Sequence, residues 1–249
     1  MFVYVSLLMI LILPIALAAM LFYLIGFRKP MKFIINKLAQ LWALSIVKIT
    51  GVKATVTGKE NIPRSGGVCF VSNHCGYFDI ILLLAFCTRQ FGFIAKKELA
   101  FVPFLNCWIF MLGGLFIDRK NIRKGIKTIR KGAQRISTGG GMIIFPEGTR
   151  SKGQGLLSFR PGSLKLATMA KAPIVPVAIE GSYDVFEKTK RFVRTPVKLA
   201  FLKPIDTKDM PREDQKNILC DKIYLAIKEE LDIDKKSICT QLDRFLLIL

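Results

Sequence analysis

The feature that most constrains the fold is an uncharged amino terminus, because residues 1–27 contain no Asp, Glu, Lys, Arg or His. A helix of this length would reach roughly 40 Å, more than the bilayer hydrocarbon core of about 30 Å. Pro14 lies in the middle of the stretch and is expected to kink or break the helix. No basic residue precedes the apolar run, so the run lacks the pattern of a secretory signal. We therefore expect residues 1–27 to contact a membrane.

Basic residues follow this segment at once, beginning with Arg28 and Lys29, and the first acidic residue is Glu60. If the segment spans a bilayer, the positive-inside rule places the rest of the chain in the cytoplasm. Residues 31–50 have a helical, basic and Trp-bearing pattern, which fits a helix at the membrane interface or a core helix packed on the next domain. We predict that residues 1–50 are membrane-anchoring helices at the cell membrane.

From residue 52 onward, short apolar runs alternate with helical patterns, which indicates an α/β fold with a mostly parallel central sheet flanked by helices. This predicts one domain over residues 51–249, with residues 236–249 packed on the sheet or touching lipid. The expected strands are 52–57, 68–72, 92–95, 115–117, 142–145, 174–179 and 197–202. The expected helices lie near 79–88, 103–112, 121–137, 161–171 and 212–231.

The amino-acid composition indicates which kind of molecule the protein binds. The formal charge of +20 attracts phosphate-rich partners, either anionic lipid or nucleic acid. Yet 51% of the residues are hydrophobic, and the aromatic residues lie in apolar runs and not among the Lys and Arg groups, which argues against nucleic acid. The six cysteines form no C-x-x-C pair and the chain has one histidine, so we expect no disulfide framework, metal site or cofactor.

The single histidine, His74, follows the apolar run 68–72 and precedes Asp79 by five residues. Ligands of open α/β sheets bind beyond the carboxyl ends of strands. A carboxylate could hold one imidazole nitrogen and leave the other free to take a proton. The two residues cannot share a helical face at this spacing, so a turn at Gly76 must bring them together. The alternative is a capped or packed histidine without a chemical role.

Two further clusters also follow predicted strands. Arg119 ends the run 113–119, and its planar guanidinium suits a phosphate, although an ion pair with Asp118 is the plainer reading. In the run 145–151, Gly148 lets backbone approach a ligand, Glu147 could accept a hydroxyl hydrogen bond, and Arg150 adds a cation. A turn at a strand exit would explain the same residues.

A fourth run, 173–179, carries Pro176 inside a strand, which suggests a sheet edge, a bulge or a shaped wall. The helical pattern 121–137 has an apolar stripe and a strongly basic remainder, which fits either a solvated face or a platform facing anionic lipid.

With these four runs, NHCGYFD, GGLFIDR, FPEGTRS and PIVPVAI, the chain resembles the glycerolipid acyltransferases, specifically those that acylate 1-acyl-glycerol-3-phosphate. The runs occur in the family's order between residues 73 and 179. The resemblance implies transfer of an acyl group from acyl-CoA or acyl carrier protein to the 2-hydroxyl of 1-acyl-glycerol-3-phosphate, giving phosphatidic acid. Membrane lipids would be its partners, and the amino-terminal helix pair would enter the membrane from one side.

The resemblance also implies residue roles. His74 would be the general base, oriented by Asp79, and Arg119 would bind the acceptor phosphate. Glu147, Gly148 and Thr149 would shape the acceptor site, Arg150 would be a further phosphate ligand, and Lys96 matches a basic residue between the first two blocks.

Three alternatives remain open. The acceptor could be another lysophospholipid or glycerol 3-phosphate. Cys75 beside His74 could form a hydrolase nucleophile pair, although neighbours in sequence rarely reach each other productively and no G-x-S-x-G elbow is present. The chain could also be a non-catalytic basic protein of the membrane surface.

Overall fold

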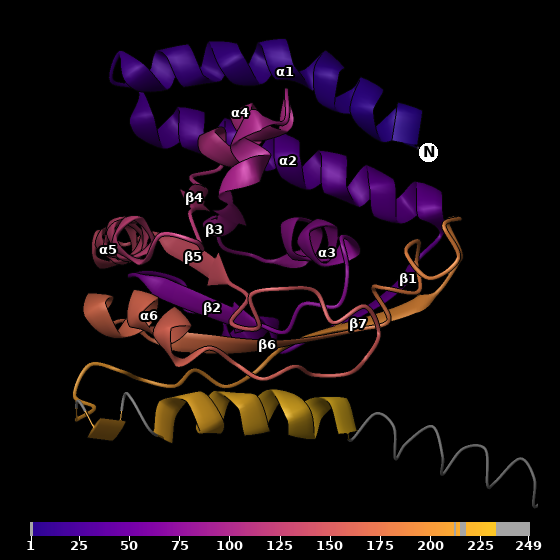
Figure 1. The fold of residues 1–249 in the computed structure, drawn as a ribbon. Coiled ribbons are helices and arrows are strands. Elements are labelled where there is room, and N and C mark those ends of the chain that lie inside the picture. The colour runs from indigo at the N-terminus through magenta and orange to yellow at the C-terminus, as the bar shows by residue number, and fades with distance from the viewer. Residues whose placement is uncertain (1, 212, 215–217, 233–249) are drawn as a thin grey trace, which may run out of the picture.

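The computed structural model describes residues 2–211, 213–214 and 218–232 (Figure 1). Seven strands form one sheet in the order β1-β7-β6-β2-β5-β3-β4. They are β1 (Lys53–Thr57), β2 (Val68–Ser72), β3 (Phe91–Lys96), β4 (Leu115–Ile117), β5 (Gly141–Ile144), β6 (Ile174–Glu180) and β7 (Pro196–Phe201). All neighbouring pairs are parallel except β6 with β7, so the predicted mostly parallel α/β sheet is confirmed.

Helices cover both faces of this sheet (Figure 1). Six α-helices are labelled: α1 (Phe2–Leu24), α2 (Arg28–Thr50), α3 (Phe78–Phe86), α4 (Leu105–Met111), α5 (Ile122–Ser137) and α6 (Lys165–Ala170). Residues 218–232 are also helical, and short 3-10 turns lie at η1 (Lys59–Asn61), η2 (Lys97–Phe101) and η3 (Pro161–Leu164). The predicted segment 236–249 lies outside the described residues.

The central strands are buried on both faces, which explains their continuous apolar runs. Along β2, Val68 and Phe70 pack with α1 to α4, whereas Cys69 and Val71 pack with α5, α6 and the helix 218–232. Period-two alternation therefore divides the central strands between two apolar layers.

The amino-terminal helices α1 and α2 run side by side across one side of the molecule (Figure 1). α2 packs inward through Ile35, Ala39, Ala43 and Ile46, which share one helical face and are almost fully buried. α2 ends at Gly51, whose φ of +67° gives the left-handed cap that glycine favours.

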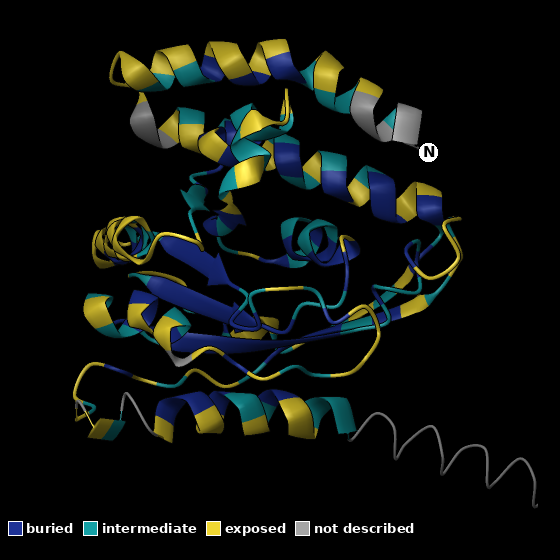
Figure 2. Ribbon diagram, viewed as in Figure 1, coloured by how far each residue is buried: buried dark blue, intermediate teal, exposed yellow. Residues whose placement is uncertain are grey.

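α1 lies outside α2, and most of its large apolar side chains are exposed (Figure 2), among them Leu11, Leu21 and Leu24. Both helices are long and apolar enough to cross a membrane by length and composition. An uncharged helix with an unburied apolar surface is the pattern of a membrane-associated segment.

Three local expectations differ from the structure. Of the kink or break expected at Pro14, the break does not occur, since α1 continues through this residue as one helix. Pro176 lies in β6, inside the sheet between β7 and β2, and not in an edge strand; its carbonyl accepts the N–H of Leu202, just before the ladder to β7 begins at Val177. On α5 the apolar stripe is buried only in its second half, because Ile122 and Ile126 are 78% and 45% exposed.

Candidate active site

The predicted site residues gather at one edge of the sheet because five neighbouring strands, β6, β2, β5, β3 and β4, run in the same direction. Their carboxyl ends therefore meet at that edge. His74 follows β2, Glu147 follows β5, and Arg119 follows β4, whereas Lys96 is the last residue of β3.

Asn73 joins two of these strand ends. Its side-chain amide donates to the carbonyl of Ile179 at 2.8 Å and accepts the N–H of Ile179 at 2.8 Å. Asn73 is 2% exposed, so this paired contact is shielded from water. It fixes the position from which the next residue, His74, leaves β2.

The His74 imidazole and the Asp79 carboxylate are in direct contact, as predicted. Nδ1 of His74 lies 2.6 Å from Oδ2 of Asp79. Asp79 lies in the first turn of α3 and is fully buried, whereas the His74 side chain is 19% exposed. The ring of Phe145 stacks on the imidazole with 4.1 Å between centroids. The imidazole is therefore held on two sides and remains accessible.

The hydrogen bonds around Asp79 assign the imidazole tautomer. Oδ2 also accepts the backbone N–H groups of Cys75 at 2.7 Å and Gly76 at 3.1 Å, and Oδ1 accepts the hydroxyl of Ser182. Because this carboxylate accepts at both oxygens, Nδ1 of His74 is the donor in their contact. Nε2 is then left with a free lone pair, as a general base requires.

The turn between the two residues depends on Gly76, for a reason of space. A Cβ at Gly76 would lie 2.4 Å from Oε2 of Glu187. Glu187 accepts the N–H of Tyr77 and pairs with Arg150, so its carboxylate occupies the position that a side chain at residue 76 would need.

The segment 145–152 is fastened to the histidine segment by backbone contacts. The N–H of His74 donates to Oε1 of Glu147 at 2.8 Å, and the N–H of Ser151 donates to the carbonyl of His74 at 2.7 Å. Lys152 donates in the same way to Cys75 at 3.1 Å. Two of the predicted motifs thus form one unit.

Glu147 is 4% exposed, and within the described residues its second carboxyl oxygen has no hydrogen-bond partner. Burial, with a smaller contribution from the Asp79 carboxylate, raises the pKa of Glu147 to about 7 against the opposing backbone N–H groups of His74 and Leu157. Glu147 thus supports the backbone of the histidine, and its protonation changes near neutral pH.

Arg119 and Arg160 lie on either side of Gly148. Arg119 donates a hydrogen bond to the Gly148 carbonyl, and an added Cβ on Gly148 would come within 2.9 Å of Arg160 Nε. Partial burial and the nearby Arg160 charge lower the pKa of Arg119. Two guanidinium groups at one edge of the site are suited to an anion.

The other predicted site residues are placed differently. Arg150 pairs with Glu187 and lies 3.7 Å from the centre of the Tyr77 ring, so its charge already has partners. Thr149 is exposed, and Lys96 is a surface side chain 3.6 Å from Glu98. Their binding roles stay predictions.

Four residues were not assigned a role from the sequence: Phe145, Arg160, Ser182 and Glu187. Phe145 lies within a recognised motif, but nothing local marks it as the platform of His74. Ser182 and Glu187 contact Asp79 and Tyr77 across 103 and 110 residues, a separation that no short pattern encodes.

Within the part of the chain that the structure describes, no three His, Cys, Asp or Glu side chains gather as metal ligands would. The chemistry visible at this edge is that of a base, its orienting carboxylate and nearby cations.

Comparison with known proteins identifies the family of the chain. The sequence model of the Acyltransferase family matches residues 53–180, just over half of the chain. The chain belongs to the Acyltransferase family.

Several curated relatives have similar sequences. One is the 1-acyl-sn-glycerol-3-phosphate acyltransferase of Borreliella burgdorferi, 32% identical over 140 residues, which is 56% of each chain. Another is the human 1-acyl-sn-glycerol-3-phosphate acyltransferase alpha, 31% identical over 182 residues, 72% of this chain and 64% of the human one. The aligned part therefore spans less than two thirds of these two relatives.

A solved structure extends the likeness to nearly the whole chain. The crystal structure of the 1-acyl-sn-glycerophosphate (LPA) acyltransferase PlsC from Thermotoga maritima superposes with a TM-score of 0.76 at 27% identity. The match covers 94% of this chain and 95% of that one, so the fold is shared in both its sheet and its helical layers.

Proposed function

We propose that the protein transfers an acyl group from a thioester, either acyl-CoA or acyl carrier protein, to the 2-hydroxyl of 1-acyl-glycerol-3-phosphate. The observation that carries this proposal is the 2.6 Å contact between His74 Nδ1 and Asp79 Oδ2, which leaves Nε2 free to accept a proton. The names of the relatives supply the acceptor, and the cations beside the site suit its phosphate.

The proposed chemistry needs one base and no covalent enzyme intermediate. As the acceptor oxygen attacks the thioester carbonyl, its proton passes to Nε2 of His74. The tetrahedral intermediate then collapses, the carbon–sulfur bond breaks, and the leaving thiolate takes the proton from the imidazolium. The Asp79 carboxylate stabilises that imidazolium and is fixed by Cys75, Gly76 and Ser182. Positioning of both substrates supplies much of the rate.

We assign phosphate binding to Arg119, with Arg160 beside it. The two side chains flank Gly148, and Gly148 belongs to the segment whose backbone contacts the histidine segment. The segment 145–152, which is hydrogen-bonded to the backbone of the histidine segment, would therefore set the position of a bound phosphate relative to His74. Arg150 is the weaker candidate because Glu187 already neutralises it.

The environment of Cys75 argues against a hydrolase with a cysteine nucleophile. Its Sγ contacts the carbonyl of Ile179 at 3.3 Å. Burial, with the Asp79 and Glu147 carboxylates, holds the pKa of the Cys75 thiol well above its usual range. A reactive cysteine needs the opposite, a thiolate stabilised by nearby positive charge.

We further propose that the α1–α2 hairpin lies in one leaflet of the cell membrane with the α/β domain on the cytoplasmic side. α2 packs along the domain through Ile35, Ala39 and Ala43, and Gln40 donates to the carbonyl of Ala85 on α3 at 3.3 Å. A helix bound to the domain in this way cannot also cross the bilayer. The basic residues from Arg28 onward favour the cytoplasmic side.

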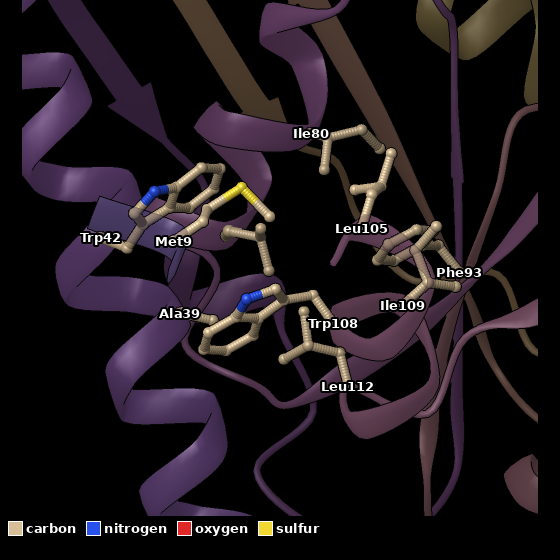
Figure 3. A pocket seen from close by; sticks show the side chains of 10 residues that line it. Met9, Ala39, Trp42, Ile80, Phe93, Leu105, Trp108, Ile109 and Leu112 are labelled. Atoms are coloured by element: carbon tan, nitrogen blue, oxygen red, sulfur yellow. The ribbon is translucent and has the colours of Figure 1, made fainter. Parts of the chain in front are cut away.

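An apolar cavity of about 70 Å³ lies between this hairpin and α3 and α4 (Figure 3). Met9 and Trp42 from the hairpin face Ile80 and Leu105, and Trp108 forms a further wall. Ile80 is the neighbour of Asp79, so the cavity reaches from the membrane-associated helices to the helix that carries the orienting carboxylate. We assign it to a segment of an acyl chain.

A panel of acceptors tests the proposal. Purified protein in lipid is assayed with a defined acyl donor and with 1-acyl-glycerol-3-phosphate, a neutral 1-acyl-glycerol, a lysophosphatidylcholine or glycerol 3-phosphate. The proposal predicts the highest kcat/KM for 1-acyl-glycerol-3-phosphate. It also predicts that Arg119→Gln raises KM for that acceptor about tenfold or more and leaves the neutral acceptor unchanged.

Arg123→Gln is the matched control, because Arg123 lies on the exposed face of α5 near Arg119 in sequence. A higher kcat/KM for an acceptor without phosphate on glycerol would contradict the assigned substrate. Thioester loss that proceeds as fast without an acceptor would favour hydrolysis.

A further inference from the structure

A second pocket, of about 360 Å³, opens at the other edge of the sheet from His74. Its floor is made by the starts of β3 and β5, at Phe91–Gly92 and Gly141–Met142, whereas the active-site residues follow strand ends. Because β3 and β5 are parallel neighbours, the pocket and the active site lie at opposite edges of one sheet.

The wall of this pocket carries positive charge without a compensating acid. Lys32 from α2 and Arg135 from α5 both line it, and none of its lining residues is Asp or Glu. Among the described residues, no carboxylate lies within ion-pair distance of either side chain. Two cations that line one pocket repel each other, and an anion bound between them would offset that repulsion.

The structure also orients one of these cations. Arg135 donates through Nη1 to the carbonyl of Gly113, with Gly114 O at 3.4 Å, which fixes its guanidinium on the pocket wall. Burial lowers the pKa of Arg135, so the group is partly desolvated. A partly desolvated guanidinium gains more from an anionic ligand than one in bulk water does.

The remaining wall is apolar and faces the membrane-associated helices. Met20, Tyr23 and Leu24 of α1 line the pocket together with Phe110 of α4. Leu24 and Phe110 are 68% and 61% exposed, and Leu21 and Ile25 beside them are exposed as well. The residues of α1 that line the pocket are thus neighbours of the exposed apolar residues of that helix.

We propose that this pocket binds the phosphate head group of an anionic phospholipid, with the phosphate between Lys32 and Arg135 and the acyl chains along α1. A free inorganic anion would use the cations alone and would leave Met20, Leu24 and Phe110 exposed. A phospholipid would contact both walls, because its phosphate can lie at the cationic wall while its acyl chains lie along the apolar wall. The site would fix the height and orientation of the domain on the bilayer independently of catalysis.

The test uses the full chain and vesicles of phosphatidylcholine with or without about a fifth of phosphatidylglycerol. Phosphatidylglycerol serves as the probe because it is neither the proposed acceptor nor the proposed product. Lys32→Gln should weaken binding to the anionic vesicles roughly tenfold, because it removes a charge-assisted contact, and should not change binding to neutral vesicles.

Lys37→Gln is the matched control, since Lys37 is an exposed residue of the same helix that does not line the pocket and loses the same charge. Its effect should stay below about fivefold, the share of one lysine near an anionic surface. Equal losses in both variants would overturn the proposal in favour of diffuse attraction.

A second variant keeps the shape of the pocket and changes only its charge. Gln90 lines the pocket, so Gln90→Glu places a carboxylate beside the cations and should reduce binding to anionic vesicles as Lys32→Gln does. Thermal unfolding in neutral detergent checks that both variants remain folded.

A final measurement distinguishes binding of a phospholipid from binding of free phosphate. A short-chain phosphatidylglycerol should raise the unfolding temperature of the wild type and not of Lys32→Gln, and inorganic phosphate at the same concentration and ionic strength should do so much less. Equal stabilisation by both ligands would overturn the assignment to a phospholipid.

Discussion

At the scale of single residues, Asp79 is the most connected polar group of the candidate site. It is fully buried and accepts hydrogen bonds from His74, Cys75, Gly76 and Ser182. Such a carboxylate cannot turn with its partner, so the plane and tautomer of the imidazole are set before substrate arrives. The proposed catalysis by His74 would therefore depend on residues that touch no substrate.

Ser182 is the clearest of these positioning residues. Ser182→Ala removes the hydroxyl that donates to Oδ1 of Asp79, so we expect kcat to fall roughly tenfold with KM unchanged for both substrates. Steady-state kinetics on purified protein measures both values. Ser182→Thr should retain most of kcat, and Ser137→Ala, at the exposed end of α5, should have no effect. An unchanged kcat in Ser182→Ala would refute the positioning role.

We expect the free energy of unfolding to depend on pH through Glu147. Its pKa is raised from 4.5 to about 7, so the folded state keeps a proton that the unfolded state loses. This contribution is present below pH 4.5 and is lost as the pH rises through about 7.

Denaturant unfolding in neutral detergent at about pH 5 and about pH 8 should show this loss in the wild type and a smaller one in Glu147→Gln. Glu60→Gln, at an exposed glutamate, should behave as the wild type does. The same pH dependence in Glu147→Gln and the wild type would remove Glu147 as its source.

At the scale of elements, the segment 145–152 is held between two partners. Ser151 and Lys152 bind the backbone of the histidine segment, and Gly148 contacts Arg119 and approaches Arg160. Any shift of this loop would therefore move the histidine backbone together with Arg119 and Arg160, the two arginines proposed to bind phosphate.

Gly148→Ala should reveal that coupling. The φ of Gly148 is +71°, and an added Cβ would lie 2.9 Å from Arg160 Nε. We expect a loss of about 1–2 kcal/mol in unfolding free energy and a higher KM for 1-acyl-glycerol-3-phosphate. Gly155→Ala has a φ of +88° but open space at its Cβ, so it should cost stability without the change in KM. Equal KM values in the two variants would contradict the coupling.

The elements themselves could be predicted because their signals are local. The strands β2, β5 and β6 are continuous apolar runs, and the contact of His74 with Asp79 needs only a five-residue turn. Other features depend on residues far apart in the chain and could not be predicted. These are the pairing of β7 with β6, the burial of Pro176 and the contacts of Ser182 and Glu187. Arg150 is an example: the sequence predicted it as a phosphate ligand, and its ion pair with Glu187 became visible only in the fold.

At the scale of the whole molecule, the two faces of the sheet differ in surface chemistry. On one face the outer helix α1 carries many exposed large apolar residues, whereas α5, α6 and the helix 218–232 cover the opposite face (Figures 1 and 2). The active-site edge lies between these faces, so membrane contact through α1 would leave it open to a donor from the aqueous side.

Leu21→Lys tests this orientation. Leu21 is 61% exposed on α1, and a lysine there should weaken partition into neutral vesicles more than about tenfold. Leu225→Lys is the control, because Leu225 is 51% exposed on the helix 218–232 at the far face. Sedimentation with vesicles measures both, and equal losses would contradict the assigned membrane face.

The central claim is that His74, steered by Asp79, removes the proton from the acceptor hydroxyl. The most direct test measures the rate of phosphatidic acid formation from 1-acyl-glycerol-3-phosphate and an acyl thioester by wild type and His74→Ala, with unfolding temperatures as the check on folding. We predict a rate at least about a thousandfold lower for His74→Ala and an unfolding temperature close to that of the wild type. A folded His74→Ala protein whose rate stays within about tenfold of the wild type would contradict the account.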